Sequence, residues 1–351
     1  MVIIIAYSVV WSIVSISFST SLSSKEFPLS EKWTTKLKGD VEQITIVENR
    51  VIIARTVKEI YALDMQSGKI LWRQSTARHF SYQPVLAKNG ILFLTDGKGV
   101  LALNQSDGKV LWQQGLRHPS GAEIVNVTQD LVAVNDPPYL IVYEAANGAL
   151  RWEKEVCREP VQAYFFDTNI VVPCFGLTAI DALSGETVWE TKSDDGADRI
   201  WKSAFADGVI YFTQDLKNIT AYDVKNRKQL WKRPMADDYD SFQAYTVMGD
   251  NLLVIIDDQL CVLDRDDGRN IWCANDLIKP KNPTIFEQIL YLFNGLQNGI
   301  TAYDILDGSQ IGRLDFPTYN FISFENDRKL MVSSDEFLIF ANGGKIYAYG
   351  K

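Results

Sequence analysis

Tryptophans recur through this chain at a nearly constant spacing, and this repeat limits the fold more than any other feature. Seven of the nine tryptophans follow one another at intervals of 37 to 42 residues. They are Trp33, Trp72, Trp112, Trp152, Trp189, Trp231 and Trp272. Trp72 and Trp189 end the exact pattern Ala-x-Asp-x-x-x-Gly-x-x-x-Trp, and the four tryptophans at 112, 152, 231 and 272 end close variants of it. A period of about 40 residues is typical of β-propellers, in which each repeat forms one blade.

Three further apolar runs lie between successive tryptophans. After Trp72 they occupy residues 84–87, 91–95 and 100–103, and Asn-Gly separates the first from the second. Short runs rich in Val, Ile and Phe, bounded by turn residues, indicate antiparallel strands. The repeat therefore predicts four strands per unit, with the tryptophan on the fourth.

The acidic or amide residue of the pattern is predicted to turn the third strand into the fourth. Its side chain can accept hydrogen bonds from turn amides, and the glycine supplies the positive φ that such hairpins need. The small residue two positions earlier leaves room for an indole, so each tryptophan is expected to fill the wedge between neighbouring blades. The predicted turn residues are Asp64, Asn104, Asp181, Asp223, Asp264 and Asp304.

The two ends of the sequence are predicted to close the ring together. Residues 337–349 align with residues 91–103, a second and a third strand, and no fourth strand follows them. The missing strand is expected at residues 33–37, because Trp33 lies one period before Trp72. Fourth strands are expected around residues 33, 72, 112, 152, 189, 231, 272 and 312, the last with Gly312 in place of tryptophan. We predict an all-β, eight-bladed propeller over residues 25–351, closed by an N-terminal strand that completes the last blade.

Residues 1–24 contain no charged side chain, and residues 2–18 are apolar with interspersed serines. Such a segment is either a signal peptide or an uncleaved membrane anchor. Both alternatives predict export to the periplasmic or extracellular side of the cell envelope.

The four cysteines agree with an oxidising compartment. Cys261 and Cys273 lie symmetrically about residue 267, the centre of a predicted hairpin, so they are expected opposite each other and able to form a disulfide. A pairing of Cys157 with Cys174 has less support, and four reduced, buried thiols are the alternative. The absence of a Cys-x-x-Cys pair argues against a cysteine zinc site.

The charge balance, 35 basic against 44 acidic residues, argues against a nucleic-acid partner. Loops from fourth to first strands and from second to third strands are expected at one end of the ring. In blades four to six these loops carry nine aspartates: Asp194, Asp195, Asp198, Asp215, Asp237, Asp238, Asp240, Asp257 and Asp258. They form either a solvated rim or a docking surface for a basic protein or peptide. The partner-binding candidates are Asp198, Arg199, Asp237 and Asp238.

The sequence offers little that could catalyse a reaction. His79 and His118 follow the fourth strands of consecutive blades, but no nucleophile with an orienting acid accompanies them. A metal pair is the alternative to two exposed loop histidines. Residues 264–268 form an acidic turn that lacks the bidentate glutamate of a calcium loop, and no glycine-rich phosphate loop opens a helix. We therefore predict no catalytic, cofactor-binding or metal-binding residue.

The repeated pattern resembles the tryptophan-docking motif of the propellers built from pyrroloquinoline-quinone (PQQ) repeats. One branch of that superfamily is the quinoprotein alcohol dehydrogenases, which bind PQQ with calcium and often cover the cofactor with a disulfide between adjacent cysteines. Resemblance to this branch implies the same cofactor site. This chain is much shorter than those enzymes and has no adjacent cysteines.

A second branch is closer in size and type, the BamB-type outer-membrane assembly lipoproteins. The resemblance implies an eight-bladed, non-enzymatic scaffold that grips partner proteins through its loops. Residues 197–200, Ala-Asp-Arg-Ile, are similar to the Asp-Arg-Leu element of that family's partner-binding loop, after which Trp201-Lys202 departs from the family's acidic continuation. The family's N-terminal lipoprotein cysteine has no counterpart, since the first cysteine is Cys157.

These observations predict an exported or membrane-tethered, monomeric propeller that binds a protein or peptide partner and carries no cofactor. The alternatives are a PQQ-dependent dehydrogenase and a sensory ectodomain.

Overall fold

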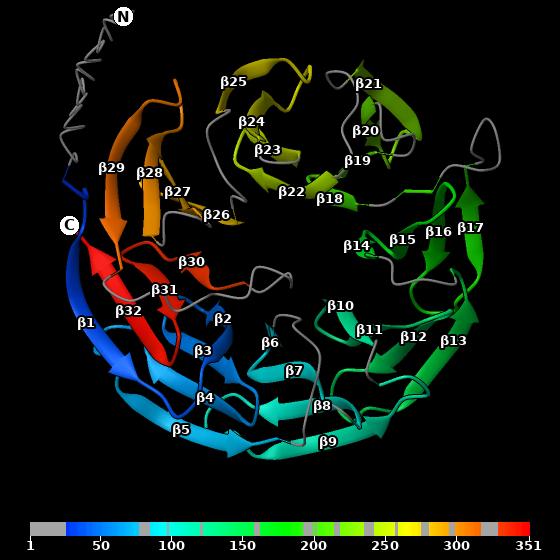
Figure 1. Ribbon diagram of the computed structural model, residues 1–351. Helices are drawn as coiled ribbons and strands as arrows, with labels where there is room; N and C mark the ends of the chain where they lie inside the picture. Colours follow the sequence, from blue (N-terminus) through cyan, green and yellow to red (C-terminus); the bar gives the residue numbers. More distant parts are fainter. Residues whose placement is uncertain are drawn as a thin grey trace, which may run out of the picture.

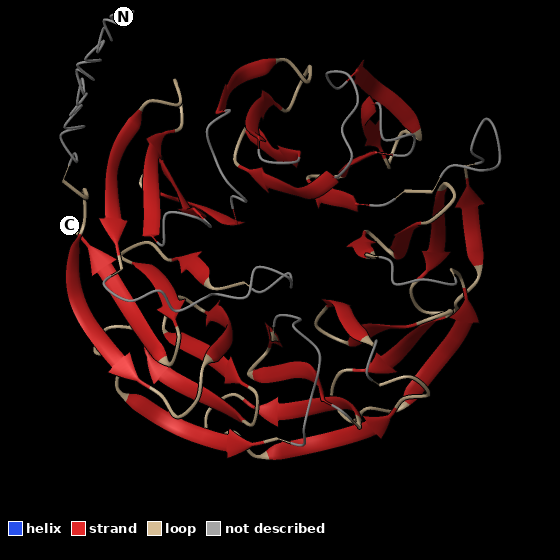
Figure 2. Cartoon of the chain, in the orientation of Figure 1, coloured by secondary structure: helices blue, strands red, loops and turns tan. Residues whose placement is uncertain are grey.

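The structure is a ring of β-sheets (Figures 1 and 2). This computed structural model describes residues 26–76, 85–96, 98–119, 122–157, 162–191, 199–200, 202–213, 218–234, 242–256, 259–274, 281–294, 299–316 and 329–351. Within these ranges the strands form eight sheets of four, and all strand pairs are antiparallel. No helix in the described ranges is long and apolar enough to cross a membrane. The predicted all-β, eight-bladed fold is confirmed.

The sheets are named here blade 1 to blade 8, and the first strand of each blade is the innermost. Blade 1 contains β2 (Val41–Val47), β3 (Val51–Thr56), β4 (Glu59–Asp64) and β5 (Ile70–Ser75). Blade 2 contains β6 (Leu86–Lys88), β7 (Ile91–Asp96), β8 (Gly99–Asn104) and β9 (Val110–Gly115). Blade 3 contains β10 (Glu123–Val127), β11 (Leu131–Asp136), β12 (Tyr139–Glu144) and β13 (Leu150–Glu155). Blade 4 contains β14 (Tyr164–Phe166), β15 (Asn169–Pro173), β16 (Leu177–Asp181) and β17 (Thr187–Glu190).

The second half of the ring repeats this order. Blade 5 contains β18 (Lys202–Ala206), β19 (Val209–Thr213), β20 (Asn218–Asp223) and β21 (Lys228–Pro234). Blade 6 contains β22 (Phe242–Met248), β23 (Asn251–Ile256), β24 (Gln259–Asp264) and β25 (Asn270–Ala274). Blade 7 contains β26 (Lys281–Phe286), β27 (Ile289–Asn294), β28 (Gly299–Asp304) and β29 (Gln310–Asp315). Blade 8 contains β30 (Met331–Ser333), β31 (Leu338–Asn342), β32 (Lys345–Gly350) and β1 (Ser30–Lys36).

Blade 8 joins the two ends of the described chain. Strand β1, the first in sequence, pairs along its length with β32, the last, and Figure 1 shows the two side by side. Trp33 lies opposite Ala348, and Thr34 lies opposite Tyr347. The ring is therefore closed by the N-terminal strand, as the repeat predicts. The outer strand of blade 8 is the first strand in the sequence, whereas its other three strands are the last.

The hydrophobic core lies between neighbouring blades. Second strands such as β11 are buried on both faces, because each blade stands face to face with the next one. Outer strands such as β5 alternate between exposed and partly buried residues, since only one of their faces packs against another blade. The buried residues accordingly fall into clusters that bridge pairs of sheets, such as blades 1 and 2.

Six of the repeated tryptophans join one blade to the next. Trp72 lies opposite Ala62 within its own blade, and its indole Nε1 donates a hydrogen bond of 2.8 Å to the Gln105 carbonyl of blade 2. Five other wedges show the same bond: Trp33 to Met65, Trp112 to Ala145, Trp152 to Ala182, Trp231 to Arg265, and Trp272 to Ile305. The acceptor always lies in the turn between the third and fourth strands of the following blade.

In six of the turns between third and fourth strands, the polar residue that opens the turn stabilises its shape. The Asp64 carboxylate accepts a hydrogen bond of 2.9 Å from the Ser67 amide, and the Asn104 amide oxygen accepts one of 2.8 Å from the Ser106 amide. Asp181, Asp223, Asp264 and Asp304 accept equivalent bonds in their own turns. Each turn therefore presents its backbone to the preceding blade's indole in a fixed conformation.

Candidate functional site

Two sets of loops open at the same end of the ring, as the repeat predicts. Backbone hydrogen bonds join the segment after a fourth strand to the loop between a second and a third strand. Examples are Thr76 to Lys58 at 3.0 Å and Val156 to Pro138 at 2.9 Å. Loops far apart in sequence therefore form one surface, called here the loop end.

Most of the predicted partner-binding residues lie outside the described residues. This applies to Asp198, Asp237 and Asp238, and to the other six aspartates of the predicted acidic rim. Arg199 is described and is partly buried, and desolvation lowers the pKa of its guanidinium below the ordinary value. Of the four candidates, the structure therefore places this one alone.

Ile200 anchors the segment that carries Arg199. Its side chain is buried, with 3% exposed, among residues of blades 4 and 5 such as Val171 and Phe212. Its amide donates a hydrogen bond of 2.7 Å to the Cys174 carbonyl. An apolar side chain and a backbone bond together fix the point where this segment meets the loop end.

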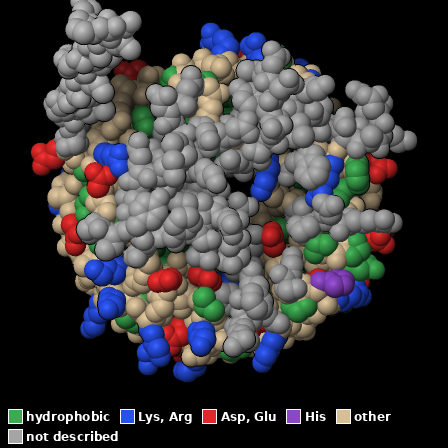
Figure 3. Space-filling view, viewed as in Figure 1, with side chains coloured by type: hydrophobic (Ala, Val, Ile, Leu, Met, Phe, Trp, Pro, Cys, Tyr) green, Lys and Arg blue, Asp and Glu red, His purple; other side chains and the backbone are tan. Residues whose placement is uncertain are grey.

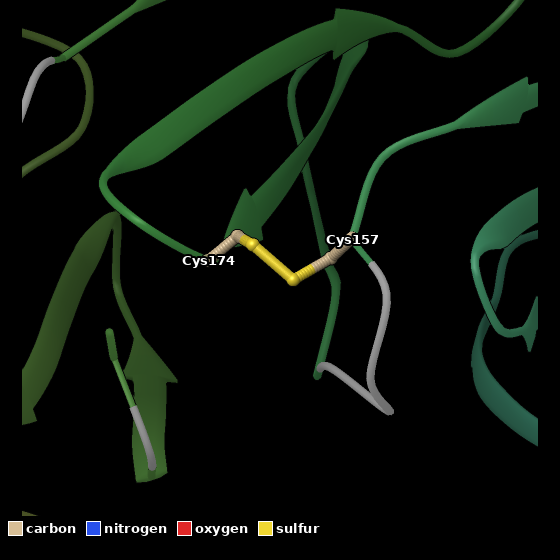
Figure 4. The surroundings of a disulfide bond; sticks show 2 residues. All are labelled: Cys157 and Cys174. Atoms are coloured by element: carbon tan, nitrogen blue, oxygen red, sulfur yellow. A yellow bond between two sulfur atoms is a disulfide. The ribbon is translucent and has the colours of Figure 1, made fainter. Parts of the chain in front are cut away.

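A disulfide stiffens the base of the same region (Figure 4). Cys157 follows the outer strand of blade 3, Cys174 follows the second strand of blade 4, and their Cα atoms lie 6.2 Å apart. The bond therefore links two blades at Cys174, the residue whose carbonyl accepts the hydrogen bond from the Ile200 amide. The sequence left this pairing open because hairpin symmetry cannot relate residues of different sheets.

Phe175 presents an exposed aromatic ring beside that disulfide. It lies in the loop between β15 and β16, and 53% of it is exposed. Val57, in the corresponding loop of blade 1, is also exposed at 46%. Buried aromatic anchors dominate many protein interfaces, so an exposed ring on a rigid base is a candidate anchor. Sequence reasoning missed Phe175, although the run Cys-Phe-Gly places an aromatic residue in a loop.

The second disulfide lies within blade 6. Cys261 of β24 lies opposite Cys273 of β25, and a disulfide joins them. This is the juxtaposition that the hairpin symmetry about residue 267 predicts. The bond links neighbouring strands of one sheet rather than two blades.

His118 is exposed, and His79 lies outside the described residues. The His118 Nδ1 lies 3.4 Å from an oxygen of Asp136, whose side chain is fully buried. Asp136 accepts hydrogen bonds from the Arg117 and His118 amides at 2.8 and 3.0 Å. This carboxylate therefore holds the loop between blades 2 and 3. Among the described residues, no group of three or more His, Cys, Asp or Glu side chains could hold a metal ion.

A buried arginine joins blades 1 and 2 at the loop end. Arg55 is 1% exposed, and its guanidinium donates a hydrogen bond of 2.6 Å to the Thr95 carbonyl. Burial lowers the pKa of Arg55 to about 10, although Glu42 and Asp96 oppose that shift. The repeat gave no indication of this cluster, because Arg55 has no equivalent in other blades; an arginine at the end of an apolar run was the available signal.

The described part of the face in Figure 3 carries acidic and basic side chains side by side. Lys and Arg side chains gather along the edge of the disc over β5 and β9. Charge on this part of the molecule is therefore mixed.

Solved structures share this fold. BamB from Moraxella catarrhalis is similar with a TM-score of 0.70 at 15% identity, over 92% of this chain and 98% of that one. The designed protein Ika8 gives 0.70 at 13% identity, over 90% of this chain and 98% of that one. Quinohemoprotein alcohol dehydrogenase from Comamonas testosteroni gives 0.67 at 11% identity, over 92% and 76% of the two chains. At these identities the likeness concerns the fold.

Sequence comparison leads to a family. The chain is 24% identical over 350 residues to the outer membrane protein assembly factor BamB of Yersinia pestis, covering 95% of this chain and 76% of that protein. The family described as outer membrane protein assembly factor BamB matches residues 10–164 and 175–349, which is most of the sequence. The predicted resemblance is thereby confirmed, and this chain belongs to the BamB family of PQQ-like propellers.

Proposed function

We propose that this protein is a non-enzymatic propeller that binds a protein or peptide partner through its loop end. The observation that carries the proposal is the family match over most of the chain, because that family is described as an outer membrane protein assembly factor. Arg199, Ile200 and Phe175 support it, since they place a charged group and an exposed ring on a base fixed by a disulfide. The aspartates predicted on the same end give a basic partner a complementary surface.

We further propose that the protein works outside the cytoplasm. Residues 1–24 act either as a signal peptide that is cleaved or as an anchor that stays in the membrane. The apolar, uncharged character of this segment supports export. The two disulfides also support it, because such bonds persist in oxidising compartments.

A binding experiment tests the partner-binding function. The wild-type protein is used to capture partners from an envelope extract of the source organism, and the captured partner is then purified for affinity measurements. Phe175→Ala is expected to weaken its binding about tenfold, equivalent to about 1.4 kcal/mol. Asp198→Arg is expected to weaken binding of a basic partner through charge repulsion.

Leu306→Ala is the matched control, since Leu306 is 74% exposed in a turn between third and fourth strands, away from the loop end. Unchanged affinity in both loop-end variants, or repeated failure to capture any partner, would contradict the proposal.

A quinoprotein dehydrogenase is the second candidate, because the fold is shared with the Comamonas testosteroni enzyme. The cysteines do not fit the cofactor cover that the resemblance implies, since they pair 157 with 174 and 261 with 273 rather than with a neighbour. Addition of PQQ and calcium, followed by a dye-linked alcohol oxidation assay, decides between the candidates. We expect no absorbance shift and no turnover; a saturable shift with turnover would favour the dehydrogenase.

A further inference from the structure

One wedge of the ring lacks its tryptophan. Blade 7 has Gly312 at the position where the other outer strands carry an indole, opposite Ala302. Wedge 7/8, defined as the space between blade 7 and blade 8, therefore needs another residue to fill it. An unfilled gap at this position would leave apolar core residues of both blades without contacts.

The topology of blade 8 explains why a tryptophan could not dock there in the usual way. In the six wedges described above, the indole donates to a carbonyl in the turn between the third and fourth strands of the next blade. In blade 8 those strands are β32 and β1, which lie at opposite ends of the described chain. No short turn joins them, so the usual acceptor is missing.

The segment before β1 occupies the wedge instead. A Cβ atom on Gly312 would lie 2.5 Å from the Glu26 carbonyl oxygen, 3.1 Å from the Phe27 Cα and 3.1 Å from the Pro28 Cδ. Residues 26–28 therefore lie directly against the glycine. A larger residue at 312 and this segment cannot occupy the same space.

Phe27 makes the aromatic contacts that a docking tryptophan makes elsewhere. Its ring centroid lies 5.7 Å from that of Tyr291 and 5.8 Å from that of Tyr349, both edge to face. Trp112 contacts Phe93 at 5.9 Å and Tyr143 at 6.4 Å in wedge 2/3.

The two sets of partners occupy matching positions. Tyr291 and Phe93 are each the third residue of a second strand, β27 and β7. Tyr349 and Tyr143 are each the fifth residue of the following blade's third strand, β32 and β12. Phe27 therefore stands where an indole would stand.

We propose that wedge 7/8 is a binding site for a short aromatic–proline segment, occupied in the same chain by Glu26–Pro28, with Phe27 as the eighth docking residue. The N-terminal segment then closes the ring twice, once as the strand β1 and once as a side chain in the wedge. Because this segment directly follows the predicted leader, any cleavage of the leader has to fall before Glu26.

A mutant cycle in the full chain tests this proposal, with the denaturation midpoint as the measurement. Phe27→Ala is expected to lower the midpoint, whereas Phe27→Trp is expected to keep it near the wild-type value. Gly312→Trp is expected to lower the midpoint of the wild type, because residues 26–28 occupy the space. The same change is expected to lower the midpoint of the Phe27→Ala variant by less, because residues 26–28 bind the wedge more weakly without the Phe27 ring and leave it more readily for the indole.

Leu306→Ala, an exposed change in the same blade, provides the reference. The proposal is overturned if Phe27→Ala behaves like Leu306→Ala, if Phe27→Trp is as damaging as Phe27→Ala, or if Gly312→Trp lowers the midpoint equally in both backgrounds.

Discussion

At the scale of single residues, each turn glycine makes room for the tryptophan of the preceding blade. Gly68 and Trp72 belong to one hairpin in the sequence, but a Cβ on Gly68 would lie 2.4 Å from the ring of Trp33. The repeat predicted the positive φ of these glycines, which Gly68 shows at 67°. The repeat could not show that the lack of a Cβ atom also makes room for the indole of the neighbouring blade, because that contact joins two different repeats.

The turn of blade 5 is the one described turn between third and fourth strands that lacks this glycine. This turn has Arg227 where the others have glycine, with a φ of 53°. The guanidinium carbon of Arg227 lies 5.6 Å from the centroid of the Trp189 ring. A cation–π contact therefore occurs in the wedge whose turn lacks glycine.

Two glycines with the same backbone conformation separate strain from packing. Gly108→Ala is expected to destabilise the protein well beyond the ~1 kcal/mol cost of a left-handed alanine. The reason is that its Cβ would lie 2.5 Å from the Trp72 ring. Gly90→Ala, at a φ of 74° with open space around it, is expected to show the conformational cost alone. Equal losses in urea unfolding would contradict the packing role.

Removing an indole tests the same wedge from the other side. Trp72→Ala is expected to cost about 3 kcal/mol of unfolding free energy, near the lower end for tryptophan because the ring is only partly buried. Trp72→Phe is expected to cost less, since it keeps most of the apolar contact and loses the bond to Gln105. Denaturant unfolding monitored by circular dichroism measures both. A loss for Trp72→Ala no larger than that for Leu306→Ala would argue against the wedge assignment.

At the scale of elements, the turns and the two disulfides differ in how far the sequence determines them. The turn residues follow from spacing alone, because Asp64 and its equivalents bond within five residues of themselves. The pairing of Cys261 with Cys273 also follows from local symmetry, since both lie in one hairpin. Cys157 and Cys174 belong to separate sheets, so their pairing depends on how blades 3 and 4 pack, which no hairpin pattern encodes.

The turn carboxylates make stability depend on pH in acid. Hydrogen bonds lower the pKa of Asp64, from the Ser67 side chain first, and that of Asp181, from the Ser184 amide first. A depressed folded pKa means that the stabilisation is present above the unfolded value of about 3.9 and is lost as pH falls through the folded pKa. Asp64→Asn should therefore lose less stability than the wild type between pH 5 and pH 2.

Asn104 provides the reciprocal control, because it makes the same turn bond without a titratable group. Asn104→Asp should add acid sensitivity. Unfolding midpoints of the three proteins that fall in parallel with pH would show that these carboxylates do not contribute.

Removing the bond between blades tests the rigid base of the loop end. Replacing Cys157 and Cys174 with alanine is expected to cost about 3 kcal/mol, since the bond closes a loop of 17 residues in the unfolded chain. The Ile200 amide, which bonds to the Cys174 carbonyl, should exchange its hydrogen faster. The same double change at Cys261 and Cys273 should leave Ile200 exchange unaltered. Unchanged Ile200 exchange in both variants would separate the disulfide from the loop anchor.

At the scale of the whole molecule, the repeat determines the ring and says little about individual sites. Blade number, strand order and the closing partner of β32 all follow from a period of about 40 residues, because every blade has the same four strands and packs against its neighbours in the same way. Arg55, Phe27 and Phe175 could not be predicted in this way. Each occurs once, and its role depends on neighbours from another blade or on exposure.

A crosslink between β1 and β32 tests whether the two ends of the described chain share one sheet. Thr34 and Tyr347 are register partners on β1 and β32. Thr34→Cys combined with Tyr347→Cys is expected to form an intramolecular disulfide in the folded protein, detected by mass spectrometry of the crosslinked peptides. Thr34→Cys combined with Leu150→Cys is the control, because Leu150 lies on β13 of blade 3, and this pair should not crosslink. Absence of the first crosslink, or equal yields from both pairs, would contradict the closed ring.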